Sequence, residues 1–209
     1  MSTTAVTSRL YPHQATLVIV PEEVQPISTN RLYLRPMTVT DAAAIHEIRR
    51  RQDVADWLYP KITHKNISET EAMISKKNFA TPDASGALRR SFFFAITLSD
   101  DPLQKVIGGA GINALFPAPS VGYSIHPDFW SNGYATEAVA GVIDAWWSLE
   151  RKTFDEDMAE LSPEKLFAAC NKANIGSMKV LQKTGFALYH EFTVGDETVA
   201  LLELERCAR

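Results

Sequence analysis

Trp130-Ser131-Asn132-Gly133-Tyr134-Ala135-Thr136-Glu137 is the most informative segment of this chain. It comes after an apolar run, Val121 to His126, that indicates a strand ended by Pro127, and it opens a helix expected over Tyr134 to Leu149. The first N–H groups of a helix have no acceptor inside it, and the helix dipole adds positive potential at the same end. Such a helix start attracts a pyrophosphate, and Gly133 lets the backbone approach it closely.

A second segment repeats this arrangement further along the chain. Lys165 to Ala169 indicates a buried strand, and a helix is expected over Ile175 to Lys183. Asn171, Asn174 and Ser177 lie at this junction, and the last two share a helical face because they are three residues apart. Either segment alone could be an ordinary loop that enters a helix. Two such segments, each after a buried strand, predict a ligand site at the ends of these strands.

The other elements predict a mixed α+β fold. The alternation in Arg31 to Arg35 indicates a half-buried strand, and two pairs typical of a capping box, Thr38 with Asp41 and Ser68 with Glu71, precede short helices. The order of strands and helices predicts one sheet with helices on both faces. Further strands are expected at Ser91–Leu98 and Val106–Ile112, and as a closing hairpin after Phe186 around Gly195.

The chain is long enough for one substantial core, which we expect over residues 27–209. Residues 1–26 lack helical periodicity and contain three prolines, so they predict an extended arm in which Ala15 to Val20 could pair as an edge strand. The acidic stretch at about 151–163 predicts a solvated insert rather than a helix or strand.

The composition argues against several classes of protein. A formal net charge of −4 and a pI near 5.7 disfavour nucleic-acid binding, which needs clustered Lys and Arg. Cys170 and Cys207 are the only cysteines, and without a CxxC motif or a His cluster neither a disulfide framework nor a metal site is expected. The apolar runs are far shorter than the ~18 residues that cross a bilayer. We therefore expect a cytoplasmic protein with no membrane span.

Three segments, in this order along the chain, resemble the GNAT superfamily of N-acetyltransferases and, more narrowly, its ribosomal-protein N-terminal acetyltransferase-like (Rim-type) branch. They are Thr29–Arg35 leading to Asp41, Gly122 through Pro127 and Trp130 to Ala138, and Asn174–Ser177 continuing through Lys183 to Phe186. The resemblance implies a GNAT-type fold, in which a largely antiparallel central sheet is splayed open and acetyl-CoA is wedged into the opening. It implies that the opening lies between the strands Val106–Ile112 and Val121–His126.

The resemblance also implies roles for individual residues. Backbone groups around His126 would pair with the pantetheine amides as an added strand does, and Ser177 would return a proton to the departing thiolate. The chain departs from the usual pattern at Trp130, where a Gln or Arg is common, and at Ser120, where many relatives carry an acid. The cofactor-binding residues implied are Ile125, His126, Pro127, Trp130, Ser131, Asn132, Gly133, Tyr134, Ala135, Thr136, Asn171, Asn174 and Ser177.

Direct transfer of an acetyl group to a primary amine needs an uncharged amine and a proton acceptor. Glu137 and His126 are candidate catalytic bases beside Ser177, and Asp128 is a further choice. Glu137 also fits a purely structural role at its helix start. Glu197, in the closing hairpin, could hold the amine of the acceptor. Cys170 has no neighbouring base in the sequence, so an acyl-cysteine route is disfavoured.

Two alternatives to this enzyme are compatible with parts of the sequence. A non-catalytic acyl-CoA-binding or assembly module with the same fold would explain Ser120 and the unassigned base. A Rossmann-like nucleotide enzyme is disfavoured because no GxGxxG follows the first strand. The acceptor stays open between a peptide N-terminus and a small-molecule amine, and the protein is expected to be a monomer or a homodimer.

Overall fold

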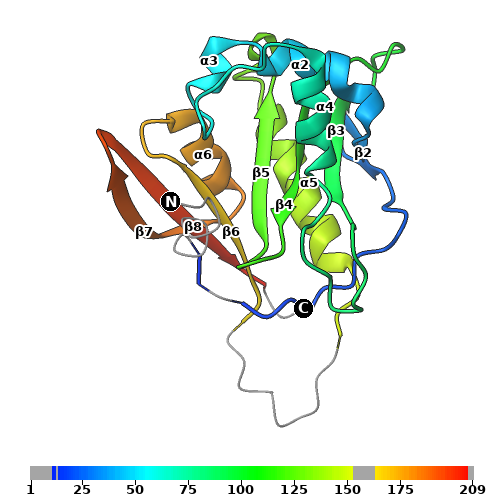
Figure 1. Ribbon diagram of the computed structural model, residues 1–209, viewed down its shortest axis with the longest axis vertical. Coiled ribbons are helices and arrows are strands. Elements are labelled where there is room, and N and C mark those ends of the chain that lie inside the picture. The colour runs from blue at the N-terminus through cyan, green and yellow to red at the C-terminus, as the bar shows by residue number, and fades with distance from the viewer. Residues whose placement is uncertain (1–10, 13, 153–162, 207–209) are drawn as a thin grey trace.

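The computed structural model describes residues 11–12, 14–152 and 163–206, in which eight strands form one sheet in the order β1-β2-β3-β4-β5-β6-β8-β7 (Figure 1). The strands are β1 (Ile27–Ser28), β2 (Leu32–Pro36), β3 (Phe92–Leu98), β4 (Val106–Ala114), β5 (Ser120–Ile125), β6 (Lys165–Asn171), β7 (Ala187–Val194) and β8 (Glu197–Glu205). The helices are α2 (Ala42–Arg49), α3 (Gln52–Ala55), α4 (Ile67–Ser75), α5 (Tyr134–Ser148) and α6 (Ile175–Lys183), with short 3-10 turns η1 (Val39–Asp41) and η2 (Pro127–Phe129). None of the helices in these described ranges is long and apolar enough to cross a membrane.

The opening in the sheet lies between β5 and β6. β4 and β5, between which it was expected, pair along their shared length, with Gly108 opposite Ile125 at one end. The expected position is therefore wrong. β5 and β6 run parallel and share a single pair, Ser120 with Phe167. Connectivity explains why β4–β5 is closed and β5–β6 is open. A short loop joins β4 to β5 as an antiparallel hairpin, whereas α5 lies between β5 and β6 in the chain, and β6 pairs with β5 only at the first residue of β5.

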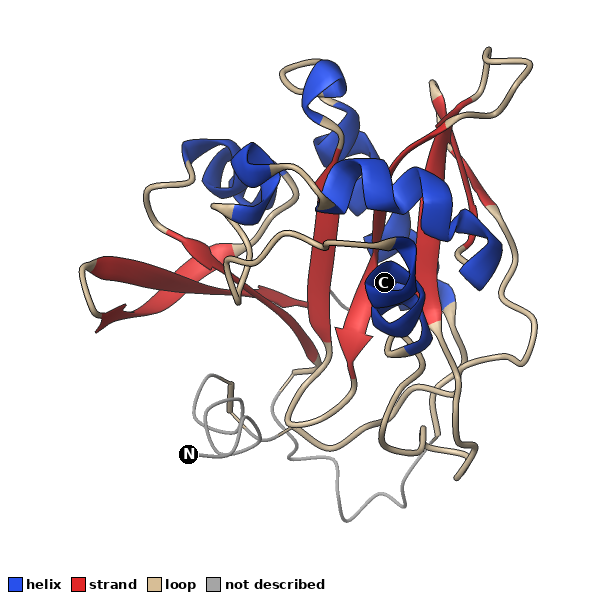
Figure 2. Cartoon of the chain, turned by 45° about the horizontal axis from the view of Figure 1, so that its top comes forward, coloured by secondary structure: helices blue, strands red, loops and turns tan. Residues whose placement is uncertain are grey.

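Helices cover both faces of the sheet, as predicted (Figure 2). α5 and α6 pack on one face and bury the main core around Trp146, whose ring meets Phe92 edge-on at 5.2 Å between centroids. α2 and α4 pack on the other face through a smaller cluster that includes Ile45, Ile74 and Val106. Because full burial of a large apolar side chain stabilises a fold by roughly 1.5–3 kcal/mol, these clusters hold the helices in place on both sides of the opening.

Most elements begin and end within two residues of their predicted bounds. The capping box before α2 is confirmed, since the Thr38 N–H donates to the Asp41 carboxylate at 2.9 Å. The predicted box at Ser68 is wrong, because Asn66 caps α4 with a side chain that accepts the Glu69 N–H at 3.0 Å. Ser68 lies inside the helix instead. Asn and Ser are equally good N-caps, so the local sequence did not distinguish them.

The segment that precedes β1 contributes to the core. Val18 and Val20 are buried, and Val18 pairs with Arg151 in an isolated bridge instead of the expected edge strand. The Gln14 side chain bonds both backbone groups of Lys165, at 2.9 and 3.0 Å, and ties this segment to the start of β6. Residues 1–10 of the predicted arm lie outside the described residues.

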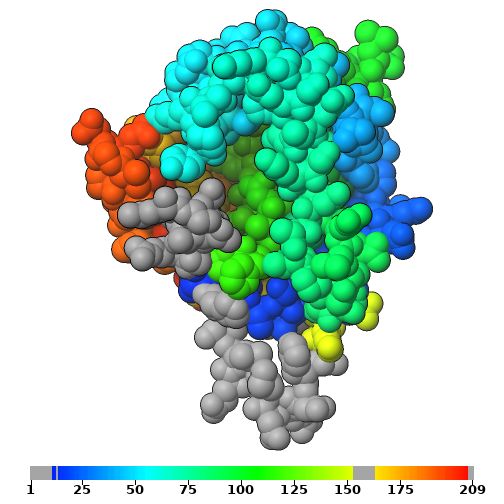
Figure 3. Space-filling view, in the orientation of Figure 1, coloured from blue at the N-terminus to red at the C-terminus, as the bar shows by residue number. Residues whose placement is uncertain are grey.

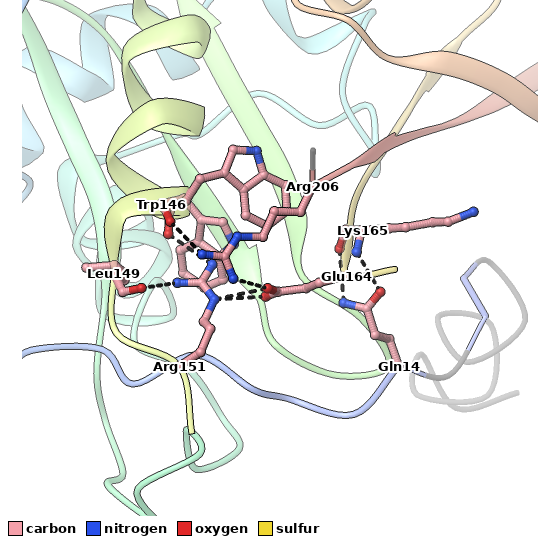
Figure 4. A network of polar contacts seen from close by, with 8 residues as sticks. Gln14, Trp146, Leu149, Arg151, Glu164, Lys165 and Arg206 are labelled. Atoms are coloured by element: carbon pink, nitrogen blue, oxygen red, sulfur yellow. Dashed lines mark hydrogen bonds and ion pairs between the residues drawn. The ribbon is translucent and has the colours of Figure 1, made fainter. Parts of the chain in front are cut away.

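A largely buried ion-pair network joins the ends of α5, β6 and β8 (Figure 4). The Glu164 carboxylate accepts from Arg151 Nε at 3.0 Å and from Arg206 Nη1 at 3.3 Å. Arg151 also donates to two carbonyl oxygens at the end of α5. The chain is thus anchored immediately before and after the predicted acidic insert, most of which (153–162) lies outside the described residues.

Candidate active site

The opening between β5 and β6 is bordered by two helix starts. The strands touch at Ser120 and Phe167 and separate toward their carboxyl ends (Figure 1). α5 begins at Tyr134 after β5, and α6 begins at Ile175 after β6. Ligands of open sheets bind at the carboxyl ends of parallel strands, and helix starts attract anions. The two segments singled out in the sequence therefore border the same opening.

The loop that enters α5 presents backbone amides without partners. Within the described part of the chain, no protein group accepts a hydrogen bond from the N–H groups of Ser131 to Thr136. Ser131 and Gly133 have φ values of +63° and +80°, a left-handed conformation that helps to form an anion-binding concavity of N–H groups. Such a conformation costs a residue other than glycine about 1 kcal/mol. The loop therefore has the donors, the dipole and the small residue that a pyrophosphate site needs.

Trp130 fixes the start of this loop through local hydrogen bonds. Its indole Nε1 donates to the Ile125 carbonyl at 2.7 Å, and its backbone N–H donates to the Pro127 carbonyl at 3.0 Å. The Asn132 side chain donates in turn to the Trp130 carbonyl at 3.0 Å. The residue that replaces the usual Gln or Arg thus holds the loop against the end of β5.

Glu137 is bound to the first of the three motif segments. Its Oε1 accepts from Thr29 Oγ1 at 2.6 Å and from the Arg31 N–H at 2.7 Å, and its Oε2 accepts from Arg31 Nε at 2.7 Å. Burial opposes ionisation of this carboxyl, but the hydrogen bonds outweigh it and lower the pKa of Glu137. A carboxylate with a lowered pKa and occupied oxygens is a poor proton acceptor. These contacts favour the structural one of the two roles considered for Glu137, and a role as a base stays an untested prediction.

The backbone of His126 and Pro127 is engaged within the protein. The His126 N–H donates to the Ile107 carbonyl at 2.8 Å, and its carbonyl accepts from the Phe129 N–H at 2.9 Å. Pro127 has no N–H. Because backbone groups alternate along a strand, the N–H of Ile125 points to the opposite edge, toward the opening. Among Ile125, His126 and Pro127, Ile125 alone directs an N–H toward the opening, so it is the residue best placed to pair with the pantetheine amides, and contacts of the other two stay a prediction.

The ring of His126 has a local structural role. Its Nδ1 accepts the backbone N–H of Asp128 at 3.3 Å and thereby caps η2. The Asp128 carboxylate, at 3.7 Å from Nδ1, belongs to a mostly exposed side chain. A catalytic role for His126 stays a prediction.

The start of α6 is organised by the two asparagines predicted there. Asn174 caps the helix, since its Oδ1 accepts the Ser177 N–H at 3.0 Å. The Asn171 side chain accepts the Ala173 N–H at 2.9 Å and shapes the turn between β6 and α6. Both amide side chains keep their NH₂ donors for another partner, because these bonds use only their oxygen atoms.

Tyr123 links the two sides of the opening and was not predicted as a site residue. It lies on β5, and its hydroxyl donates to the Ser177 carbonyl on α6 at 3.2 Å. Burial raises the pKa of Tyr123 to about 12, so the phenol stays protonated. Its position beside Gly122 in the second motif segment was the available signal, but a tyrosine in an apolar strand is more often a core residue.

Cys170 carries a protonated thiol. Burial raises its pKa to about 11, and its Sγ contacts the Met178 sulfur at 3.4 Å. A protonated thiol is a weak nucleophile, in keeping with the disfavoured acyl-cysteine route. No cluster of His, Cys, Asp or Glu suited to a metal ion occurs among the described residues.

The face that carries α2 and α4 is hollowed beside β5 (Figure 3). Strands β4 and β5 form the floor of the hollow, the segment around α3 and α4 forms one wall, and the β7–β8 hairpin forms the other. An ion pair between Lys61 and Glu197 joins the two walls. Glu197, predicted to hold the amine of the acceptor, is thus engaged by a lysine of the opposite wall.

A largely antiparallel sheet that opens between two parallel strands, with a helix start on each side, defines a transferase fold that accommodates an acyl-CoA. The chain belongs to the GNAT acetyltransferase family, because residues 31–187 match the Acetyltransferase (GNAT) domain. It is therefore an N-acetyltransferase of a family that uses acetyl-CoA.

Known proteins share both sequence and fold with this chain. The uncharacterized N-acetyltransferase YoaA of Bacillus subtilis (strain 168) is 28% identical over 163 residues, which are 77% of this chain and 81% of that protein. A GNAT-family acetyltransferase from Bacillus anthracis has a TM-score of 0.65 at 18% identity, covering 87% of this chain and 98% of the other. RimL, a ribosomal L7/L12 α-N-protein acetyltransferase in complex with coenzyme A, has a TM-score of 0.64 at 14% identity, with the same coverage. At these identities the two structures establish the fold alone.

Proposed function

We propose that this N-acetyltransferase moves the acetyl group of acetyl-CoA directly to a primary amine, on a peptide N-terminus or a small molecule. The observation that supports the proposal is the row of unpartnered N–H groups from Ser131 to Thr136, within the described part of the chain, beside the β5–β6 opening. These donors suit a pyrophosphate, and the edge of β5 at Ile125 suits the pantetheine amides. The NH₂ groups of Asn171 and Asn174 would contact the cofactor from the side of α6.

Ser177 is proposed to return a proton to the departing sulfur. In direct transfer the amine nitrogen attacks the thioester carbonyl carbon, the C–S bond breaks, and the sulfur leaves as a thiolate. The nitrogen then loses one proton and the sulfur gains one. Ser177 lies in the first turn of α6, where the helix dipole favours negative charge. Its side chain lies beside the Tyr123 hydroxyl, which also donates to the Ser177 carbonyl at 3.2 Å, and this contact holds Ser177 at the opening.

The acceptor is proposed to be an amine that needs little help in losing its proton. Glu137 is bound by Arg31, Glu197 is bound by Lys61, and Nδ1 of His126 accepts the Asp128 N–H. A free α-amine is roughly a tenth neutral at pH 7, whereas a lysine side chain is neutral only about once in two thousand. An α-amine, or another amine of low pKa, is therefore the better acceptor for this site.

Labelled acetyl-CoA and a panel of amines would test the proposal. The panel should contain ribosomal-protein N-terminal peptides, since RimL has this fold, together with other peptides, polyamines, aminoglycosides and amino acids. We expect label in at least one acceptor, and a kcat about 100-fold lower in Ser177→Ala. Native mass spectrometry would report bound coenzyme A. Tight binding without transfer to any acceptor would instead support a non-catalytic acyl-CoA-binding or assembly module.

A further inference from the structure

Two partly buried cationic side chains on the α2–α4 face lack an acidic partner among the described residues. Lys77 follows α4; its Nζ donates to Asn113 Oδ1 at 2.6 Å and lies 3.9 Å from the centre of the Phe93 ring. Arg49 ends α2; its Nε is buried without an acceptor, and its Nη2 lies 3.4 Å from His64 Nε2. Within the residues that the structure describes, no carboxylate forms an ion pair with Arg49 or Lys77.

The lack of a counter-ion in the described part of the chain sets these two side chains apart from other cations near α2. Burial lowers the pKa of Arg49, and burial together with the charge of Arg49 lowers the pKa of Lys77 to about 8. Partly buried cations without a counter-ion are costly, so a site that keeps two of them is a candidate for binding an anionic group. The neighbouring arginines each hold a carboxylate: Arg35 with Asp41, Arg50 with Glu47, and Arg51 with Asp53.

Lys77 reaches the strand that borders the opening. A Cβ on Gly122 of β5 would lie 2.0 Å from Asn113 Nδ2, so the Asn113 side chain, which accepts from Lys77, lies directly on Gly122. Val121 and Tyr123, on either side of Gly122, pack into the core under α5 and α6. By alternation Gly122 faces the other way, into the hollow. α5 and α6 cover the opposite face, so the hollow lies on the same face as Lys77 and Asn113.

We infer that Arg49 and Lys77 bind a carboxylate of the acceptor, so that the substrate is an amine that also carries a carboxylate, as in an acidic N-terminal peptide. The inference rests on the proposed function, because it takes the hollow as the path of the acceptor. A guanidinium and an ammonium bind a carboxylate by charge-assisted hydrogen bonds, which are about twice as strong as neutral ones. The carboxylate would supply the missing counter-ion.

Matched acceptors with and without the carboxylate provide the first test. Peptides that differ in a single side-chain carboxylate, such as Ser-Asp and Ser-Asn peptides, are compared by kcat/KM at saturating acetyl-CoA. In the wild type, we expect kcat/KM for the carboxylate member of the preferred pair to be at least roughly tenfold higher than for the amide member. This preference should disappear in Lys77→Met and Arg49→Met and survive in the control Lys76→Met. Equal kcat/KM within every pair would overturn the inference.

Stability and binding measurements separate the inference from its alternatives. Lys77→Met should retain or raise Tm, because it removes a partly buried charge, and should leave KM for acetyl-CoA unchanged. Loss of activity toward both members of a pair alike would assign Lys77 another role and contradict the inference. If no acceptor is acetylated, calorimetric titration with N-acetyl amino acids and their amides still tests whether the carboxylate site exists. Binding of the acids alone, lost in Lys77→Met, would uphold the carboxylate site while the proposed function fails.

Discussion

Arg31 and Glu137 form an ion pair at 2.7 Å that joins the turn between β1 and β2 to the first turn of α5. These residues are 106 positions apart in the chain. The Arg31 guanidinium also donates to the Asn132 carbonyl at 3.0 Å and lies 4.7 Å from the centre of the Tyr134 ring. Arg31 therefore holds the loop by a carbonyl group and leaves the N–H groups of that loop directed elsewhere.

Loss of this pair should weaken acetyl-CoA binding. Arg31→Ala and Glu137→Gln each remove charge-assisted hydrogen bonds that position the loop, and we expect KM for acetyl-CoA to rise roughly tenfold with a smaller change in kcat. Steady-state kinetics at saturating acceptor would measure both. The control is Arg50→Ala, which removes an exposed pair with Glu47 on α2. A fall in kcat alone for Glu137→Gln would restore Glu137 as a base and refute its structural role.

Gly133→Ala should affect the loop and the cofactor together. Gly133 has a φ of +80°, and a Cβ added to it would meet only Arg31 Nη2, at 3.5 Å, outside its own loop and helix. The stability cost should therefore be conformational, about 1 kcal/mol. We also expect a several-fold higher KM for acetyl-CoA. Gly195→Ala in the β7–β8 turn, with a φ of +61° and open space around it, should show a similar stability loss with unchanged KM.

Cys170→Ala should leave the reaction largely intact. The thiol has a pKa of about 11 and is therefore protonated at neutral pH, so it cannot readily carry the acetyl group. We expect kcat to change by less than about twofold, with no burst of acetylated enzyme in rapid-quench experiments. An acetyl adduct on Cys170 detected by mass spectrometry, together with inactivity of the variant, would rule out direct transfer.

The pair of Asp41 with Arg35 should contribute a stability that depends on pH. Burial raises the pKa of Asp41, but hydrogen bonds from Arg35 and Thr38 outweigh this effect and hold the pKa below its usual 3.8. A carboxyl with a depressed folded pKa stabilises the protein above pH 3.8, and this contribution is lost as the pH falls through the folded value. Asp41→Asn should therefore lower the free energy of unfolding at pH 7 by about 2 kcal/mol.

Urea unfolding at pH 7 and pH 3 would measure this difference. The gap between wild type and Asp41→Asn should narrow at the lower pH, because pH 3 lies below the pKa of 3.8 of the unfolded carboxyl, and part of the stabilising contribution is lost there. Asp53→Asn is the matched control, since its pair with Arg51 is exposed and should contribute little. A gap that stays constant between the two pH values would show that the charge of Asp41 does not contribute.

The local pattern was sufficient to locate most elements but not every cap. The strand before Pro127 and the helix after Gly133 have signals that lie within a few residues of each other, and both occur where expected. Asn66 was missed as a cap because Ser68 offered a local pattern of equal quality. Such choices depend on how the following helix packs against the sheet, which the local sequence does not specify.

Local sequence was enough to identify the segments that surround the site, because glycine, helix starts and strand ends act through the chemistry of adjacent residues. The packing of the whole chain was needed to establish which strands separate, that Tyr123 donates to the Ser177 carbonyl, and that Arg31 binds the Glu137 carboxylate. It also decided that Arg49 and Lys77 lack an acid among the described residues. These features depend on distances between residues far apart in the chain, and such distances are set by the packing of whole elements rather than by any pattern of neighbours.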